Sequence, residues 1–163
     1  MIEVREATLD DLPAITAMYN DAIVHSVSTF DVEPRTPARA HDWFRKHGEK
    51  HPVLVAREGD EVVGWASLNV FVGRGAYEHT VEDSVYVSPG RQRRGVGAML
   101  LGRLIERAGE LGHRSIVARI ADHSEASLAL HRSCGFTKVG VLREVGRKFD
   151  RWIDVTLMQL VLG

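Results

Sequence analysis

Residues 85–100 read Val85-Tyr-Val-Ser-Pro-Gly-Arg-Gln-Arg-Arg-Gly-Val-Gly-Ala-Met-Leu100. An apolar alternation ends at Val87, a loop rich in glycine and arginine follows, and a helical apolar period begins at Val96. Such a loop exposes backbone N–H groups and sets them at the positive end of the helix macrodipole. Residues 88–98 are therefore predicted to form an anion-binding loop between a strand and a helix.

The spacing of the glycines excludes two nucleotide-binding loops. The run has no Gly-Lys-Ser/Thr ending, which a P-loop requires. A dinucleotide-binding fingerprint requires a third small residue where Leu100 stands, and it belongs to the first turn of a parallel βα unit. The loop is thus predicted to hold a phosphate-bearing ligand of another class.

Patterns typical of strands and helices alternate on both sides of this loop. β-rich runs predict strands at residues 2–5, 53–56, 62–70, 81–87, 115–120, 139–145 and 153–160. Helical spacing and capping residues predict helices at residues 12–23, 37–47, 96–111 and 124–134. This order predicts one α/β (α+β) domain over residues 1–163, with a mixed sheet of about seven strands flanked by about four helices.

The strand before the loop carries a polar residue in an otherwise apolar row. Asp83 shares a strand face with Val81 and Val85. A bulge near Asp83 would remove this conflict and break the sheet locally. We therefore expect a bulged strand in the middle of the sheet.

The composition is that of an ordinary globular protein. Hydrophobic residues make up 44% of the chain, and its formal net charge is -1. This charge gives no global attraction to nucleic acid or anionic lipid, and no apolar run approaches the length of a membrane span. A cytoplasmic protein without nucleic-acid or membrane partners is expected. The single Cys134 and the histidine spacings form no metal-binding motif, so no metal is expected.

Two segments resemble the cofactor motifs of the GNAT superfamily of N-acetyltransferases. Gln92-Arg-Arg-Gly-Val-Gly97 matches the Q/R-x-x-G-x-G/A pyrophosphate motif, and Ala126-Ser-Leu-Ala-Leu-His-Arg-Ser-Cys-Gly-Phe136 resembles the second cofactor helix. The resemblance implies the GNAT fold, in which the strand before the loop splays from its neighbour in the middle of the sheet, and acetyl-CoA as the cosubstrate. It also implies coenzyme contacts from Val85, Tyr86, Val87, Gln92, Arg93, Arg94, Gly95, Val96, Gly97, Ala98, Ser124 and Ser127.

Longer segments resemble the phosphinothricin and methionine sulfoximine N-acetyltransferases within that superfamily. They include Ser28-Thr-Phe30, residues 76–87 and residues 140–155. The resemblance implies direct transfer of an acetyl group to the α-amine of a small amino-acid-like substrate. It further implies a homodimer that pairs through the C-terminal strands.

Two side chains are candidates for the proton transfers of this reaction. An ammonium group must lose a proton before it can attack, and Glu82 matches the acid that the resembling enzymes use in this strand. The leaving thiolate needs a proton or a positive neighbour, and His131 could provide either. In the plainer interpretation, Glu82 is an exposed strand carboxylate and His131 only satisfies a buried hydrogen bond.

The resemblance implies a substrate site of Thr29, Phe30, Val72, Gly73, Arg74, Tyr77 and Glu82. Relatives carry Phe-Arg-Pro-Arg where this chain has Phe71-Val-Gly-Arg74, so one arginine is replaced by Val72. Arg74 would pair with a substrate carboxylate in bidentate fashion. Two other functions remain open: a GNAT enzyme for protein N-termini or another amine, and a catalytically silent CoA-binding sensor.

Overall fold

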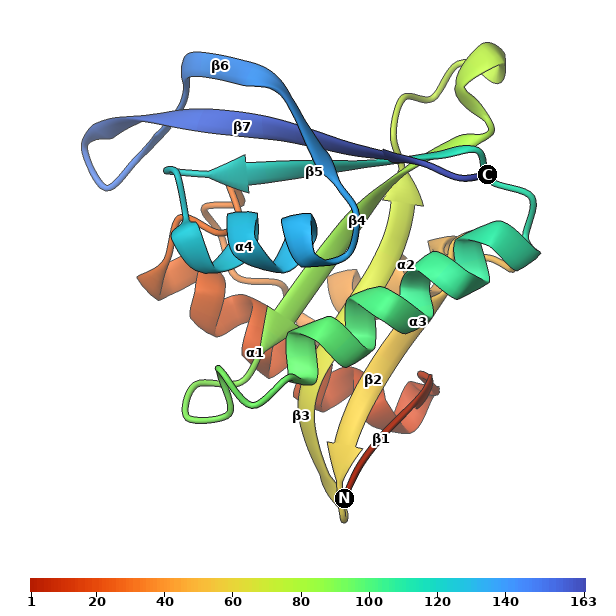
Figure 1. The fold of residues 1–163 in the computed structure, drawn as a ribbon. Coiled ribbons are helices and arrows are strands. Elements are labelled where there is room, and N and C mark those ends of the chain that lie inside the picture. Colours follow the sequence, from red (N-terminus) through yellow and green to blue (C-terminus); the bar gives the residue numbers. More distant parts are fainter.

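Seven strands form one mixed sheet in the order β1-β2-β3-β4-β5-β7-β6 in the computed structural model, which describes residues 1–163 (Figure 1). The strands are β1 (Ile2–Glu6), β2 (Val53–Glu58), β3 (Glu61–Val70), β4 (Thr80–Val87), β5 (Ser115–Ala121), β6 (Thr137–Lys148) and β7 (Arg151–Val161). The helices are α1 (Leu12–His25), α2 (Pro37–Lys46), α3 (Val96–Glu110) and α4 (Glu125–Ser133), with short 3-10 turns η1 (Leu9–Asp11) and η2 (Gly75–Tyr77). The expected fold class and element order are confirmed.

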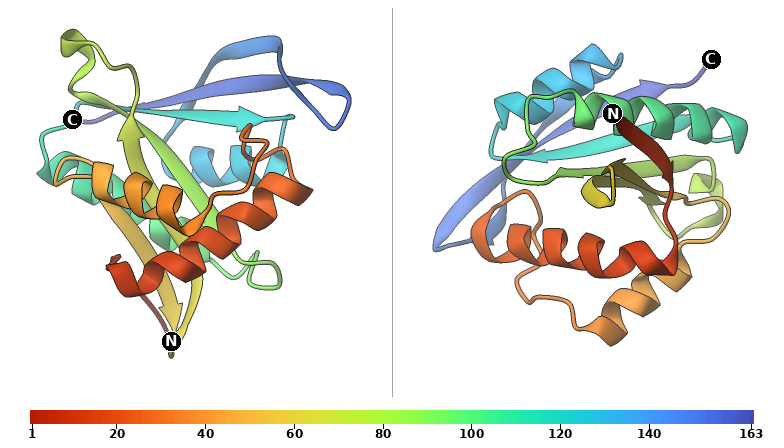
Figure 2. Two further views of the ribbon diagram at one scale, coloured as in Figure 1. Left: turned by 180° about the vertical axis from the view of Figure 1, so that it is seen from behind. Right: turned by 90° about the horizontal axis from the view of Figure 1, so that it is seen from below.

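The helices cover both faces of the sheet. Figure 2 shows α1 and α2 on one face and α3 and α4 on the other. On the α3 face, Leu100, Leu101 and Leu104 are fully buried against the sheet. On the α1 face, Ile15 and Trp65 belong to a second, smaller core cluster. Each helix therefore buries the apolar face that its sequence period predicts.

Side-chain caps stand at the start of η1, which leads into α1, and at the start of α2. The backbone N–H of Thr8 donates to the Asp11 carboxylate at 2.8 Å, and the hydroxyl of Thr36 accepts from the N–H of Arg39 at 3.2 Å. Both contacts satisfy backbone or side-chain groups in the way that is preferred at helix starts. None of the helices is long and apolar enough to cross a membrane.

The centre of the sheet is splayed but not bulged. β4 pairs with β5 only from Thr80 to Glu82, so the two strands separate beyond Glu82. β4 pairs with β3 over Val81 to Val87 without any register shift, and the bulge expected near Asp83 is therefore wrong. Oδ2 of Asp83 lies 2.7 Å from the imidazole of His131 on α4, which gives this polar side chain a partner without a bulge, while Oδ1 is buried without a partner.

Candidate active site

The gap between β4 and β5 belongs to a cavity of about 1300 Å³. Its wall includes consecutive β4 residues from Glu82 to Val87, the loop before α3, and α4. Because neighbouring residues of a strand point to opposite faces, a cavity lined by all of them reaches both sides of the sheet. One chamber thus connects the α3–α4 face with the α1–α2 face.

The loop before α3 presents a row of free backbone donors. The N–H groups of residues 92–98 donate to no acceptor within the chain. Gly95 precedes the helix with a φ of 80°, a left-handed conformation that glycine adopts without strain. These donors, together with the positive end of the α3 macrodipole, form a cradle suited to a pyrophosphate.

Arginines around this cradle differ in how free they are. Arg91 pairs with Glu58 and with Glu61, the latter at 2.8 Å, and Arg94 pairs with Glu58 at 3.3 Å. Arg93 lines the cavity and forms no ion pair within the chain. Arg93 is therefore the side chain of this loop with the most charge to offer a phosphate.

Gly97 brings the cradle close to the second cofactor helix. A Cβ at this position would lie 3.2 Å from Cδ2 of Leu130 in α4. This is closer than ordinary van der Waals contact, so a larger residue would push the two helices apart. Glycine here lets α3 begin directly against α4.

The structure brings most of the predicted coenzyme residues together. The cavity wall contains Val85, Tyr86, Val87, Gln92, Arg93, Gly95, Gly97, Ala98, Ser124 and Ser127. Val96 and Arg94 lie outside it, because the Val96 side chain is buried in the core and the Arg94 guanidinium is paired with Glu58. The Tyr86 ring stacks on Trp65 on the α1 face, which leaves its backbone to face the gap. The coenzyme-binding roles of these residues stay predictions.

Glu82 stands at the last position where β4 and β5 pair. Its side chain is 21% exposed and accepts a hydrogen bond from Arg119 of β5 at 2.6 Å. Burial raises the pKa of the Glu82 carboxyl, the charge of Arg119 opposes this, and the net direction is upward. A carboxylate with a raised pKa is better matched to accept a proton near neutral pH.

His131 and Asp83 form a buried pair on the α4 side of the cavity. Nε2 of His131 lies 2.7 Å from the Asp83 carboxylate, and Nδ1 lies 2.7 Å from the carbonyl oxygen of Ser127. Both partners are acceptors, so the arrangement suits the doubly protonated ring. Burial lowers the pKa of His131, but Asp83 and the Ser127 carbonyl outweigh it and the pKa is raised. Both contacts therefore favour the positively charged form of the ring beside the cavity.

The predicted substrate residues fall into two groups. Thr29, Phe30 and Glu82 line the cavity. Val72, Gly73, Arg74 and Tyr77 lie outside its wall, in the connection from β3 to β4 that contains η2. Gly73, Arg74 and Tyr77 are exposed there. Their substrate-binding role stays a prediction that the cavity of this chain does not favour.

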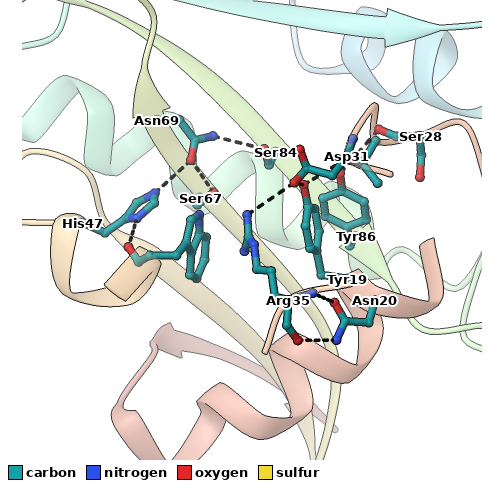
Figure 3. Close-up of polar contacts among 12 residues, drawn as sticks. Tyr19, Asn20, Ser28, Asp31, Arg35, His47, Ser67, Asn69, Ser84 and Tyr86 are labelled. Atoms are coloured by element: carbon teal, nitrogen blue, oxygen red, sulfur yellow. Dashed lines mark hydrogen bonds and ion pairs between the residues drawn. The ribbon is translucent and has the colours of Figure 1, made fainter. Parts of the chain in front are cut away.

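Several polar residues of the cavity carry no sequence motif. Asn69 of β3 donates to the hydroxyl of Ser84 at 3.0 Å (Figure 3). It also donates to the carbonyl oxygen of Glu82 at 3.1 Å, which fixes the β4 backbone beside the base candidate. Arg119 and Arg35 also line the wall. Asn69 is the register partner of Glu82, so only the strand pairing could have identified it.

An open strand edge that leads into a row of free amides is the arrangement expected from the resemblance to acetyltransferases. Residues 14–136 match the model of the Acetyltransferase (GNAT) family. The chain belongs to this family.

Curated relatives and solved structures extend the match over nearly the whole chain. An L-methionine sulfoximine/L-methionine sulfone acetyltransferase from Pseudomonas paraeruginosa is 40% identical over 98% of this chain and 94% of the relative. A phosphinothricin N-acetyltransferase from Streptomyces coelicolor is 40% identical over 94% of this chain and 92% of the relative. An acetyltransferase from Salmonella typhimurium, solved with its cofactor acetyl-CoA, superposes with a TM-score of 0.97 at 37% identity over 100% of this chain and 95% of that one.

Proposed function

We propose that this protein transfers the acetyl group of acetyl-CoA to the α-amine of a small amino-acid-like substrate, of the methionine sulfoximine, methionine sulfone or phosphinothricin type. The observation that carries the proposal is the single cavity that joins the free amides of residues 92–98 to the Glu82 carboxylate through the gap beside β4. The names of the relatives reported above support the substrate type.

The coenzyme would be held by backbone more than by side chains. The amides of residues 92–98 and the Arg93 side chain would bind the pyrophosphate. The edge of β4 beyond Glu82, which has no strand partner, would pair with the pantetheine arm. The thioester would then lie in the gap, within reach of an amine on the α1–α2 face.

Glu82 would take the proton that the attacking ammonium must lose. The amine nitrogen then forms a bond to the thioester carbon, and the carbon–sulfur bond breaks to release the thiolate. The nitrogen loses its second proton as the amide forms, and the thiolate takes up one proton to leave as the free thiol of CoA. Both ring nitrogens of His131 are already engaged by acceptors. His131 would therefore act through its positive charge, which stabilises the departing thiolate across the cavity.

Thiol release with a panel of amines tests this function. Methionine sulfoximine, methionine sulfone, phosphinothricin and the standard amino acids are supplied with acetyl-CoA, and release with at least one of them is expected. Glu82→Gln should reduce turnover by at least about a hundredfold, because general-base catalysis is worth that much or more. Glu78→Gln, an exposed carboxylate outside the cavity wall, is the matched control.

No release from any amine, with acetyl-CoA binding intact, would refute the proposed substrate class. Unchanged turnover in Glu82→Gln would refute its role as the base. An absence of turnover with every acceptor would favour the silent coenzyme sensor.

A cytoplasmic homodimer is part of the same proposal. The β6–β7 hairpin exposes large apolar side chains, among them Val139, Leu142, Val145, Phe149 and Trp152. Exposed apolar clusters of this kind mark association surfaces. Light scattering after size exclusion should give the mass of two chains, whereas a monomer would contradict the dimer. Cell fractionation tests the location.

A further inference from the structure

Arg35 is a fixed cation on the amine side of the cavity. It lies in the segment between α1 and α2, lines the cavity wall, and its side chain is 17% exposed. The guanidinium lies over the ring of Tyr19, 4.0 Å from its centroid, and 4.7 Å from the centroid of Trp43. Asn20 fixes its backbone, with hydrogen bonds of 2.8 Å to the N–H and 3.0 Å to the carbonyl oxygen. The charge is therefore held in place before any ligand binds.

The guanidinium keeps its hydrogen-bond donors free. No atom of the chain accepts a hydrogen bond from it, and the nearest carboxylate oxygen, on Asp31, lies 3.9 Å away. That oxygen already accepts from the hydroxyl of Tyr19, and the Asp31 side chain is 55% exposed. A guanidinium carries five N–H donors in a planar fork and stays ionised at ordinary pH. Arg35 is thus ready to bind an anion.

The other cations of the cavity are occupied or lie elsewhere. Arg119 is bound to Glu82 at 2.6 Å, and Arg91 is bound to Glu58 and Glu61. Arg93 belongs to the pyrophosphate cradle. Arg74, the arginine that the sequence resemblance assigns to a substrate carboxylate, lies outside the cavity wall.

Arg35 and Glu82 face the same chamber from the same side of the sheet. Glu82, Ser84 and Tyr86 share one face of β4, and the Tyr86 ring packs 5.6 Å from the ring of Tyr19 beneath Arg35. Figure 3 shows the Arg35 side chain reaching from its loop toward Asp31 and the β4 face that carries Ser84. This β4 face therefore leads from Glu82 past Ser84 to the aromatic rings beside Arg35, and both charged side chains line the one cavity.

We propose that Arg35 binds the carboxylate of the acceptor amino acid, while Glu82 receives its ammonium group. This inference rests on the proposed function and makes Arg35 the residue that selects α-amino acids over simple amines. The two opposite charges complement a zwitterion, and a guanidinium can hold a carboxylate through two parallel hydrogen bonds.

The test compares an amino acid acceptor with the amine obtained by removing its carboxylate. Arg35→Gln should lower kcat/KM for the amino acid between about tenfold and about a hundredfold, mostly through KM, because the lost contact exists before and during reaction. For the decarboxylated amine, kcat/KM should be unchanged. For each acceptor, kcat/KM of the variant is divided by kcat/KM of the wild type. This ratio removes the difference in intrinsic reactivity between the two amines.

Arg35→Lys and Arg39→Gln complete the design. Lysine keeps the charge without the fork, so an intermediate loss is expected. Arg39 is exposed on α2 and lies outside the cavity wall. Its substitution should therefore leave kcat/KM unchanged for both acceptors. An unchanged KM for acetyl-CoA checks that each variant is folded. If Arg35→Gln fails to fold, the test uses Arg35→Lys instead, together with the comparison of the wild-type kcat/KM values for the two acceptors.

An equal loss of kcat/KM for both acceptors in Arg35→Gln would overturn the role of Arg35 while leaving the proposed function in place. The same conclusion would follow if the preference for the amino acid over the amine were abolished by Arg74→Gln and kept by Arg35→Gln. Equal kcat/KM of the wild type for the two acceptors would also overturn the role of Arg35. Failure of the wild type to acetylate any amine would overturn both.

Discussion

Glu82 and Asp83 are adjacent on β4, yet they face opposite sides of the sheet and meet different partners. Glu82 accepts a hydrogen bond from Arg119, and Asp83 accepts one from His131. On the Glu82 side the carboxyl carries a raised pKa, and on the Asp83 side the imidazole does. The alternation of a strand thus gives two neighbouring acids separate environments.

The acid limb of the pH–rate profile should depend on Arg119. Burial raises the pKa of Glu82 and the charge of Arg119 lowers it, so Arg119→Gln should raise that pKa further. The ionised base is lost as pH falls through the folded pKa, and the acid limb of kcat/KM should therefore move to higher pH. Arg103→Gln, on the exposed side of α3, should leave it in place. A limb that stays or moves to lower pH in Arg119→Gln would contradict this account of Glu82.

The Asp83–His131 pair should matter for stability. Asp83→Ala leaves the buried imidazole without its partner and should lower the free energy of unfolding by about 3–5 kcal/mol. The folded pKa of His131 is raised, so the stabilisation is complete below the unfolded pKa of about 6.5 and is lost as pH rises through the folded value. Urea unfolding should therefore show a difference from wild type that shrinks as the pH is raised.

Asp122→Ala provides the comparison for an exposed pair. Asp122 binds Arg151 at 2.7 Å on the surface, and its loss should cost about 0–1 kcal/mol. An equal loss of unfolding free energy in Asp83→Ala and Asp122→Ala would contradict the distinction between the buried and the exposed pair.

At the level of elements, Gly97 should control how α3 and α4 meet. Gly97→Val would place atoms against Leu130, strain the cradle and weaken acetyl-CoA binding about tenfold or more, since overpacking costs about 1–3 kcal/mol. Gly102→Val lies in the same helix with open space around it, and acetyl-CoA binding should not change. Titration calorimetry of both variants checks this. An equal affinity in the two variants would remove Gly97 from the cradle.

The sequence was sufficient for the strands and the α-helices, because each has its own period or cap, but the 3-10 turns η1 and η2 were not predicted. The Thr36 cap and the glycines around α3 are local signals that tertiary contacts did not override. The prediction of a bulge near Asp83 was wrong, because a polar residue in an apolar row can be accommodated in two ways. Either the strand bulges, or another element supplies a hydrogen-bond partner. The partner, His131, lies 48 residues away in the chain, where no strand pattern can register it.

The candidate site, too, could be predicted only in part from the sequence. The loop of residues 92–98 is a continuous segment, so its row of free amides could be predicted from the sequence directly, while its binding of pyrophosphate stays a prediction. Arg35 and Asn69 come from separate segments with no motif, and only the folded sheet brings them to Glu82. Arg74 was favoured by resemblance alone, and the cavity wall does not include it.

On the scale of the whole molecule, the sheet separates two layers of helices, and the gap between β4 and β5 connects its two faces. α3 and α4 cover one face and α1 and α2 the other (Figure 2). The free amides of residues 92–98 lead into α3, while Arg35 lies beside Trp43 of α2. The separation of β4 from β5 beyond Glu82 supplies the opening between the two faces. Two ligands could thus enter from different faces and meet at the splayed strand.

The most direct test of this arrangement is a calorimetric titration of the folded wild-type protein with acetyl-CoA and with acetyl-pantetheine, which lacks the pyrophosphate. Acetyl-CoA should bind, and acetyl-pantetheine should bind at least about a hundredfold more weakly, since hydrogen bonds to a charged group contribute about 1.5–3 kcal/mol each. No heat with acetyl-CoA, or equal affinities for the two compounds, would contradict the claim that the amides of residues 92–98 hold the coenzyme.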